Sequence, residues 1–485
     1  MKPDETWLIP PSRGAGVMIG LVYPSTYFVG MSSLGYQLIY KILSRQSDIR
    51  VERLFYQGPG ESPLSVEAGR PAGNFDVLAF SCSFEPDYLN LIRFLLQSNI
   101  EPCSSKRSSK APLLVAGGIA VTSNPAPLSP IIDVFLLGDG EELLTETLEI
   151  FSRRMILGKE NLHQDLAVIP GVYVPSIHGE FRSESFPPRR ILKLDNWPTG
   201  SAIITAHTDL ADMYLVEAAR GCVRGCQFCL TGHFDRRWSI RSADNLLGSV
   251  ETVRQKIRRV GLIAPEIAKH PEIHQICETL VGWQLEISTS SVEMDWLDRP
   301  LMDLLIRGGQ KTLTIAPESG DEALRYALGK KISDAQILEM IHQAAEAGFE
   351  VLKMYLIIGM PRSTAAEVDA LGTFLEKARS AFFGPGGRKR KELVLSVNPF
   401  VPKPHTPWEK EPLLEEPEIK RRMLIIRQLA GKLGGIRFTG NSPAFAALDA
   451  LISHGNAQTG IILMDCITSG VGGIKEVVKR LKENI

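Results

Sequence analysis

The sequence predicts an α/β protein that is built from parallel sheets and ends in helices. Three observations support this fold class: short apolar runs alternate with helical patterns, several runs end in glycine or serine turns, and the chain after Glu415 reads as helices only. Strands that alternate with helices form parallel sheets, because each helix returns the chain to the end where the next strand begins. The 485 residues exceed one ordinary core, so we expect at least two domains.

Residues 1–160 read as a doubly wound parallel sheet with helices on both faces. The third and fourth expected strands run into Gly117-Gly118 and Gly138-Asp139-Gly140-Glu141. Ligands bind such sheets at the carboxyl ends of the strands, so Gly117, Gly118, Asp139 and Glu141 are pocket candidates. The expected strands are Val17–Val22, Val77–Phe80, Leu113–Ala116 and Val134–Leu137, and the expected helices are Ser33–Leu43, Asp87–Leu96 and Glu142–Phe151.

Residues 161–200 are rich in proline and polar residues, and we expect a β-rich connector there. Residues 201–412 then repeat the alternation of strands and helices, which predicts a partial (βα)6 barrel with active residues at the carboxyl ends of its strands. Residues 413–485 are expected to form a helical C-terminal extension. The six expected barrel strands are Met213–Glu217, Arg259–Ile263, Gln284–Ser288, Lys311–Ile315, Val351–Ile357 and Leu393–Phe400.

Composition excludes several classes of protein. Lysine and arginine total 54 and aspartate and glutamate 55, so the formal net charge of −1 gives no long-range field that would collect nucleic acid. The N-terminus lacks the basic and apolar regions of a secretory signal, and no apolar run approaches the roughly 20 residues that span a bilayer. We therefore expect a cytoplasmic protein with no membrane span. Seven cysteines are too sparse for a disulfide scaffold.

Three of the seven cysteines, Cys222, Cys226 and Cys229, lie within one short loop. Four thiolates close a 4Fe–4S cluster, whereas three leave one iron open to an external ligand with an amine and a carboxylate. The alternatives are a zinc site or three thiols without a metal. Structural zinc normally takes four protein ligands, often from two C-x-x-C pairs, and the chain has no second pair. The spacing therefore favours an iron–sulfur centre with an open coordination position.

The loop Cys222-Val-Arg-Gly-Cys226-Gln-Phe228-Cys229 resembles that of the radical S-adenosylmethionine superfamily, whose pattern is C-x-x-x-C-x-aromatic-C. The resemblance implies a 4Fe–4S cluster on the three cysteines that donates an electron to bound S-adenosylmethionine. The products are methionine and a 5′-deoxyadenosyl radical, which abstracts hydrogen from a substrate. The resemblance also implies a reducing partner such as flavodoxin or ferredoxin.

Later segments extend the resemblance to the cofactor contacts. Phe228 would lie near the adenine of S-adenosylmethionine, and Glu318 in Ala316-Pro-Glu-Ser-Gly320 would contact its ribose and methionine. Gly359, followed by Glu367, resembles the adenine-binding strand end. The second barrel strand usually ends in a Gly-Gly-Glu-type motif that binds the methionine amine. Here that strand ends in Ala264-Pro-Glu266, which departs from the motif.

The chain from about residue 15 to 480 resembles radical S-adenosylmethionine proteins, largely uncharacterised, with a Rossmann-like, cobalamin-binding-like N-terminal domain. The resemblance makes cobalamin a candidate cofactor of residues 1–160; the alternative is a sheet domain that keeps the fold without the cofactor and shapes the substrate site or has lost its role. None of the nine histidines lies there, so this domain supplies no histidine ligand to cobalt. The resembling segments are Pro24–Met31, Gly117–Pro125, Gly138–Glu141 and Phe400–Pro407.

The reaction stays open between three hypotheses. The first is a cobalamin-dependent methylation or rearrangement. The second is methylthiolation or another modification of tRNA or a ribosomal component; against it, the chain shows neither a further cysteine triad nor a C-terminal β-barrel RNA-binding domain. The third is a non-catalytic iron–sulfur carrier or sensor, which would not cleave S-adenosylmethionine. Arg224 and Lys353 are candidates for contacts to carboxylates in the site.

Overall fold

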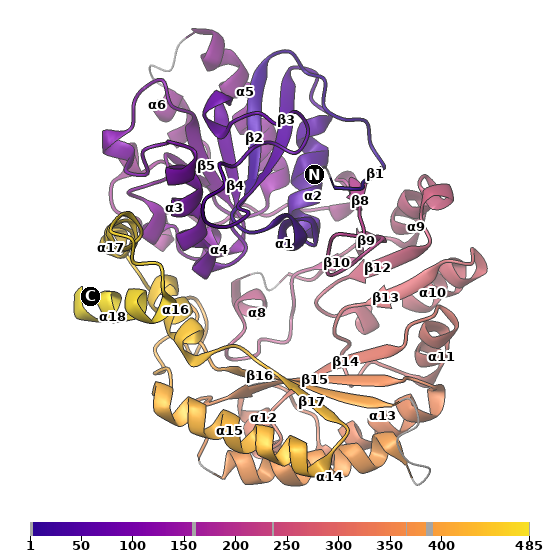
Figure 1. Ribbon diagram of the computed structural model, residues 1–485. Helices are drawn as coiled ribbons and strands as arrows, with labels where there is room; N and C mark the ends of the chain where they lie inside the picture. Colours follow the sequence, from indigo (N-terminus) through magenta and orange to yellow (C-terminus); the bar gives the residue numbers. More distant parts are fainter. Residues whose placement is uncertain (1–2, 158–161, 235–236, 365, 385–390, 485) are drawn as a thin grey trace. The chain divides into compact units, whose positions relative to one another are not determined.

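The computed structural model describes residues 3–157, 162–234, 237–364, 366–384 and 391–484. The chain divides into two units, Met1–Asp212 with Leu451–Ile485, and Met213–Ala450. Both units carry parallel sheets with helices, which confirms the predicted α/β fold class (Figure 1). The domain boundaries expected at residues 160, 200 and 412 stay predictions. No helix in the described part of the chain is long and apolar enough to cross a membrane.

The first unit is built on a six-stranded sheet with the order β3-β2-β4-β5-β6-β7. The first five strands pair in parallel, and β7 runs antiparallel at the edge. Side chains of α2 (Leu34–Ser44) and α5 (Gly140–Leu157) join one face of the sheet in a single apolar core. On the other face, Phe94 of α3 (Tyr88–Gln97) meets Phe80 edge to face at 5.7 Å. The strands are β2 (Val17–Tyr23), β3 (Ile49–Phe55), β4 (Val77–Ser81), β5 (Leu113–Gly117), β6 (Val134–Leu136) and β7 (Val172–Tyr173).

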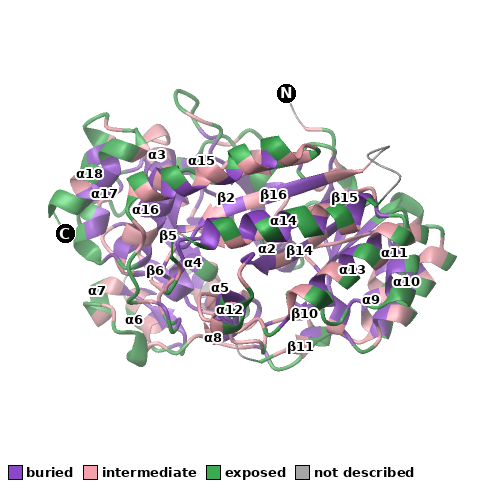
Figure 2. Cartoon of the chain, turned by 90° about the horizontal axis from the view of Figure 1, so that it is seen from below, coloured by how far each residue is buried: buried purple, intermediate pink, exposed green. Residues whose placement is uncertain are grey.

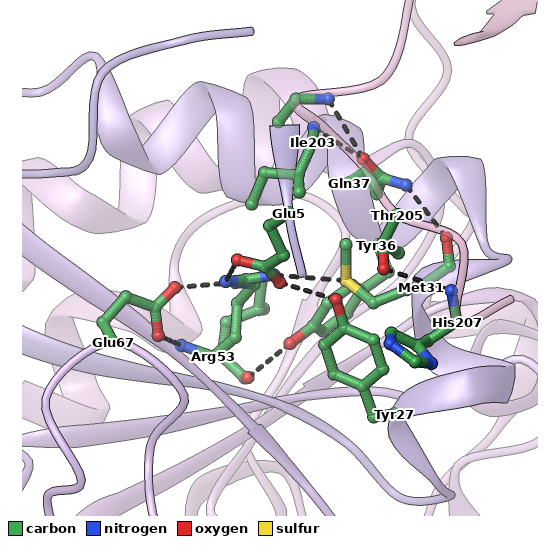
Figure 3. Close-up of polar contacts among 12 residues, drawn as sticks. Glu5, Tyr27, Met31, Tyr36, Gln37, Arg53, Glu67, Ile203, Thr205 and His207 are labelled. Atoms are coloured by element: carbon green, nitrogen blue, oxygen red, sulfur yellow. Dashed lines mark hydrogen bonds and ion pairs between the residues drawn. The ribbon is translucent and has the colours of Figure 1, made fainter. Parts of the chain in front are cut away.

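Strand β3 is absent from the sequence-based prediction, because three of its seven residues are charged. Glu52 and Arg53 are nevertheless 2% and 1% exposed. Arg53 is neutralised by Glu5 and Glu67, which approach it from segments far along the chain (Figure 3). A buried charge is tolerated when such partners surround it, and these partners are invisible to a local pattern.

The expectation of a β-rich connector over residues 161–200 is wrong. The described residues there form α6 (Leu162–Ala167), the two-residue strand β7, and α7 (Pro175–His178). Proline explains the difference, because it lacks a backbone N–H for a strand ladder and suits the first turn of a helix, where Pro175 lies. The aromatic rings of Tyr173 and Phe186 pack together at 5.0 Å and hold the segment.

The second unit contains a three-stranded sheet, β13-β12-β9, and a four-stranded sheet, β14-β15-β16-β17, all with parallel pairing. The six expected strands are present, and β17 adds a seventh. The three-stranded sheet comprises β9 (Met213–Glu217), β12 (Arg259–Ile263) and β13 (Glu286–Thr289). The four-stranded sheet comprises β14 (Thr312–Glu318), β15 (Val351–Ile358), β16 (Glu392–Pro399) and β17 (Ile436–Thr439).

Helices cover one face of the four-stranded sheet (Figure 1). Helix α13 begins where Ser333 and Gln336 form a capping box and ends at Gly348, whose φ of 110° is costly for other residues. Helices α14 and α15 each show a buried and an exposed side (Figure 2). The helices of this unit are α9 (Ala243–Glu251), α10 (Ile273–Gly282), α11 (Arg299–Arg307), α12 (Glu322–Ala327), α13 (Asp334–Ala347), α14 (Glu367–Phe383) and α15 (Glu416–Leu433).

Burial along β15 separates the two faces of this sheet. Its even-numbered residues, such as Leu352 and Met354, are fully buried, whereas Lys353, Tyr355 and Ile357 are half-buried. Alternate residues of a strand point to opposite faces, so the odd-numbered side chains share the face away from the helical layer.

The chain ends in α16 (Pro443–Ser453), α17 (Ala457–Thr468) and α18 (Ile474–Asn484), which confirms the helical C-terminus, but the expectation of helices only after Glu415 is wrong, because β17 lies within that stretch. Within the first unit, the Asn124 side-chain amide donates to the carbonyls of Ser453 and Gly455 at 3.0 and 2.8 Å. A side chain at Gly460 would collide with the Pro127 carbonyl oxygen, so the backbone of α17 packs closely there. These contacts tie the C-terminal helices to the turn that follows α4 (Ile119–Ser123).

Candidate active site

The three clustered cysteines lie in the loop that follows β9 and the short strand β10 (Ala219–Arg220), ahead of α8 (Leu230–Phe234). Gly221 and Gly225 in this loop have φ values of 80° and 65°, a backbone conformation that glycine adopts without strain. The Cys222 Sγ accepts a hydrogen bond from the backbone N–H of Arg224 at 3.5 Å. The loop therefore places its thiols at the carboxyl end of a parallel strand, as the sequence predicted.

An ion-pair network fixes the middle of this loop. The Arg224 guanidinium donates to Glu266 at 2.6 Å and to Asp295 at 2.5 Å. Glu266 is 1% exposed and follows β12, so the arginine links the cysteine loop to the neighbouring strand end. The sequence predicted that Arg224 contacts carboxylates in the site, and the two carboxylates that it contacts in the structure belong to the chain itself.

Burial raises the pKa of the Cys226 thiol to about 11; Lys330 opposes this shift, whereas Cys229 and Cys222 add to it. Among the described residues, no three His, Cys, Asp or Glu side chains converge where they could hold a single metal ion.

Phe228 packs against a small apolar cluster at the strand ends, formed by Leu324, Leu328, Met360, Phe400 and Trp408. Beside it lies a cavity of about 500 Å³, which also contacts Glu318. Two of the predicted cofactor residues, Phe228 and Glu318, therefore line the same space. The remaining lining residues are Leu230, Ser291, Ala316, Tyr355, Leu356, Ile357, Asn398, Pro399, Val401, Lys403 and Phe400.

Glu318 ends β14 in an unusual conformation. Its φ is 66°, and the register with β15 shifts between Ile315 and Glu318, so a local irregularity turns the residue out of the ladder. The side chain is 8% exposed and accepts a 2.6 Å hydrogen bond from Lys330. Burial raises the pKa of this carboxyl, and Lys330 opposes the shift.

Gly359 follows β15 at the same edge but is not among the residues that line the cavity. Its backbone N–H donates to Glu367 at 3.4 Å, and Arg422 pairs with the same carboxylate oxygen at 2.7 Å. Burial raises the pKa of Glu367, against the effect of Arg422. The other oxygen, Oε1, is buried without a hydrogen bond.

Two further acids near the cysteine loop carry no sequence motif. The Oε2 atoms of Glu266 and Glu293 are both buried without a hydrogen bond, and the Lys269 ammonium lies 4.0 Å from the former. Burial raises the pKa of Glu293 to about 7, and the charge of Glu266 adds to that effect. The sequence offered one signal, an acid directly after the second barrel strand, whereas Glu293 could not be found without the fold.

The pocket candidates of the first unit fall into two groups. Gly118 has a φ of 107°, and a side chain there would collide with the Cys82 carbonyl, so glycine keeps the backbone at the end of β5 bare. Asp139, in contrast, accepts a hydrogen bond from the Ile191 backbone at 2.9 Å, and its own backbone N–H donates to Arg189. The turn after β6 therefore holds the following segment of the chain.

Comparison with known proteins decides the family. A model described as the N-terminal domain of radical SAM proteins matches residues 35–175, and one described as the radical SAM superfamily matches residues 216–375. The chain belongs to the radical S-adenosylmethionine superfamily. It is a radical S-adenosylmethionine enzyme, and its cofactors are a 4Fe–4S cluster and S-adenosylmethionine.

Relatives of this radical S-adenosylmethionine enzyme extend over most of the chain. An uncharacterized protein of Methanocaldococcus jannaschii is 28% identical over 395 residues, which cover 81% of this chain and 79% of that protein. The methyltransferase TsrM from Kitasatospora setae, solved with cobalamin and a [4Fe-4S] cluster, has a TM-score of 0.61 at 12% identity, covering 97% of this chain and all of that one. OxsB, a cobalamin-dependent radical enzyme solved with aqua-cobalamin, has a TM-score of 0.56 at 15% identity, covering 74% and 52%. At these identities the solved structures show a shared fold.

Proposed function

We propose that Cys222, Cys226 and Cys229 hold the 4Fe–4S cluster of this enzyme and that the adjacent strand ends bind S-adenosylmethionine. When bound and reduced, the cluster supplies the electron that cleaves S-adenosylmethionine to methionine and a 5′-deoxyadenosyl radical, which abstracts hydrogen from a substrate. One observation carries the proposal: Phe228 of the cysteine loop and Glu318 of β14 line the same cavity.

The chain's own residues would then orient the cofactor and limit water. Phe228 and its apolar neighbours would pack against the adenine, and Glu318 would accept hydrogen bonds from ribose hydroxyls. Gly359, whose backbone N–H donates a hydrogen bond to Glu367, would contact the adenine at the end of β15. The Oε2 atom of Glu266, which is buried without a hydrogen bond, would accept a hydrogen bond from the methionine amine. The sequence left this contact unassigned, because the end of the second barrel strand departs from the Gly-Gly-Glu-type motif.

The cluster assignment is tested by iron content and electron paramagnetic resonance of anaerobically reconstituted protein. We expect Cys222→Ala, Cys226→Ala and Cys229→Ala each to lose the S-adenosylmethionine-perturbed signal of the reduced cluster. Cys277→Ala is the matched control, because Cys277 is a fully buried thiol on α10 of the same unit. A normal cluster signal in any of the three loop variants would contradict the proposal.

Cobalamin-dependent methylation is the second candidate, and one observation favours it. Three large apolar side chains, Phe28, Val29 and Ile119, are 44%, 41% and 43% exposed after β2 and β5 of the first unit. Carboxyl ends of such sheets are ligand positions, and TsrM and OxsB were solved with cobalamin. Residues 1–160 contain no histidine, so this unit would bind the corrinoid through that apolar edge without an imidazole from this range. Corrinoid absorption that the wild type retains after gel filtration and that Ile119→Asp loses would support cobalamin binding. A wild type that retains no corrinoid absorption would rule this candidate out.

The electron for the cluster would come from a reducing partner such as flavodoxin or ferredoxin. Family membership supports the need for a reductant. Replacement of dithionite by reduced flavodoxin or ferredoxin in the S-adenosylmethionine cleavage assay tests each protein directly.

A further inference from the structure

A separate cavity of the Met213–Ala450 unit lies at the amino ends of β12 and β13. It has a volume of about 320 Å³ and is formed by the segment that leads into β12 and the turn that leads into β13. None of its lining residues lines the cavity assigned to S-adenosylmethionine. Strand β12 has five residues, so about 15 Å of sheet separates the two ends of β12 and of its parallel neighbour β9, which the cysteine loop follows. This basal pocket is lined by Arg254, Gln255, Ile257, Arg258, Trp283, Gln284, Leu285 and Glu286.

Two guanidinium groups of the basal pocket have no counter-charge. In the part of the chain that the structure describes, neither the Arg254 nor the Arg258 side chain forms a hydrogen bond or an ion pair. The one acid that lines the pocket, Glu286, is already paired, because the Arg259 guanidinium donates to its Oε2 at 2.8 Å. With that pair counted as neutral, the pocket has two uncompensated positive charges.

The charged residues that flank the arginines along the chain do not neutralise the pocket. Glu251 and Lys256 are both exposed, lie outside the pocket lining and are opposite in sign. No ion pair joins Glu251 to Arg254 or Arg258 among the described residues. An anion that pairs with the two guanidinium groups at short range would therefore come from outside the chain.

An aromatic ring fixes the position of one guanidinium. Arg254 is half-buried, and its guanidinium carbon lies 5.4 Å from the centroid of the Trp283 ring. A guanidinium that stacks on a ring keeps its N–H groups available for a planar, bidentate contact with an oxyanion. Binding then costs less conformational entropy, because the side chain is already held. Gln255 and Gln284 add side-chain amides that can donate to the same oxyanion.

We propose that the basal pocket binds a diphosphate group, with the guanidinium groups of Arg254 and Arg258 each paired with one phosphoryl group. Arginine binds phosphate oxygens through two parallel N–H···O bonds, and a diphosphate carries enough negative charge to neutralise both side chains. Sheets of this kind carry their chemistry at the carboxyl ends of the strands, so the diphosphate ligand is neither the cofactor nor the substrate. The inference does not depend on the proposed function.

The test titrates the anaerobically reconstituted full-length protein with pyrophosphate in an isothermal titration calorimeter. We expect saturable binding to the wild type, and a dissociation constant at least about tenfold higher in Arg254→Met and in Arg258→Met. Arg427→Met is the matched control and should stay within about twofold of the wild type. Arg427 also lies over an aromatic ring, that of Phe438 at 5.1 Å, but it does not line the pocket. No binding to the wild type, or binding of wild-type strength in either pocket variant, would overturn the inference.

Further titrations of the wild type test the diphosphate assignment. Pyrophosphate should bind at least about tenfold more tightly than inorganic phosphate, which offers one phosphoryl group to two guanidinium groups. Equal affinities for these two anions, or equal affinity for the tricarboxylate citrate, would overturn the assignment. ADP separates the two sources of a diphosphate: tighter binding of ADP than of pyrophosphate would support a diphosphate ester, and weaker binding would support the free anion.

Equilibrium dialysis of S-adenosylmethionine tests whether the basal pocket is separate from the cofactor site. The dissociation constants of the wild type and Arg254→Met should agree within about twofold. A rise of about tenfold in the variant would overturn the assignment of a second, independent ligand site.

Discussion

The two units each place a cation on a strand of a parallel sheet, and they treat it differently. In β3 of the first unit, Arg53 is 1% exposed, and its three nitrogens donate to Glu5 at 2.7 and 2.9 Å and to Glu67 at 2.6 Å (Figure 3). Its guanidinium also lies over the rings of Trp7 and Tyr40, at 5.1 and 5.4 Å. Every polar atom of this arginine is used within the fold.

In β15 of the second unit, Lys353 has an aromatic ring beside it and no carboxylate from the described residues. The acids show the same contrast. Glu5 and Glu67 are paired, whereas Glu266, Glu293 and Glu367 each keep a buried oxygen without a hydrogen bond. Unsatisfied buried groups cost free energy, so these three carboxylate oxygens, on residues that follow β12, β13 and β15, are candidates for contacts with a ligand. The comparison separates a structural charge cluster from a site prepared for ligands.

The largest expected effect is on the structural side of the comparison. Arg53→Met leaves two buried carboxylates without their cation, so we expect the free energy of unfolding to fall by about 3–5 kcal/mol. Urea unfolding followed by circular dichroism measures this loss. Lys353→Met is the control and should change stability by less than about 1 kcal/mol. If the two variants lost equal stability, the distinction between the two cations would be wrong.

The next effect concerns Glu293, whose pKa is raised to about 7 mainly by burial. A carboxyl whose pKa is higher in the folded than in the unfolded state stabilises the fold below its unfolded-state pKa. That contribution is lost as the pH rises through the folded-state pKa. We therefore expect stability to fall between about pH 4.5 and 7, by at most about 3 kcal/mol from this group. Glu293→Gln should flatten this part of the profile in urea unfolding. An unchanged pH profile in the variant would show that another group titrates there.

A smaller effect is expected for Glu318→Gln. The amide keeps the shape of the side chain but loses the charge that pairs with Lys330 and would attract ribose hydroxyls. We expect the dissociation constant for S-adenosylmethionine to rise about tenfold in equilibrium dialysis. Glu339→Gln, an exposed position on α13, should leave it unchanged. Equal affinities of Glu318→Gln and the wild type would remove Glu318 from the cofactor site.

The smallest effect is expected for Glu367→Gln, since Glu367 acts through the backbone of Gly359. The variant keeps one acceptor for the Gly359 N–H but weakens the pair with Arg422. We expect about a threefold rise in the dissociation constant for S-adenosylmethionine. Combining Glu367→Gln with Arg422→Met should restore the affinity, because the second change removes the guanidinium that the amide no longer neutralises. Failure of that rescue would indicate that Glu367 contacts the cofactor itself.

The sequence predicted the parts of the site that depend on local spacing. The cysteine loop, Phe228 and Glu318 follow apolar strands in a pattern that can be read without tertiary structure. Strand β3 could not be predicted, because burial of Arg53 depends on Glu5, which lies 48 residues earlier. Strand β17 pairs with β16 across the whole of α15 and carries only four residues. Non-local partners decide these elements, and local patterns do not contain them.

The same limit applies to charges. Arg53 lies in a segment with three charged residues in seven, whereas Lys353 is the one charged residue of a predicted apolar strand, and neither pattern shows which partner the charge meets. The fold shows that one of them meets carboxylates and the other meets a tyrosine ring. The function of a buried charge is therefore a property of its surroundings, which only the assembled sheets define.

The most direct test of the account is the formation of 5′-deoxyadenosine by anaerobically reconstituted protein with dithionite and S-adenosylmethionine, measured by chromatography. We expect the wild type and Cys277→Ala to form it, and Cys226→Ala to fall to the level of the protein-free control. A cluster-loaded wild type that forms no 5′-deoxyadenosine, or a Cys226→Ala variant that still forms it, would contradict the proposal that this loop is the reaction centre.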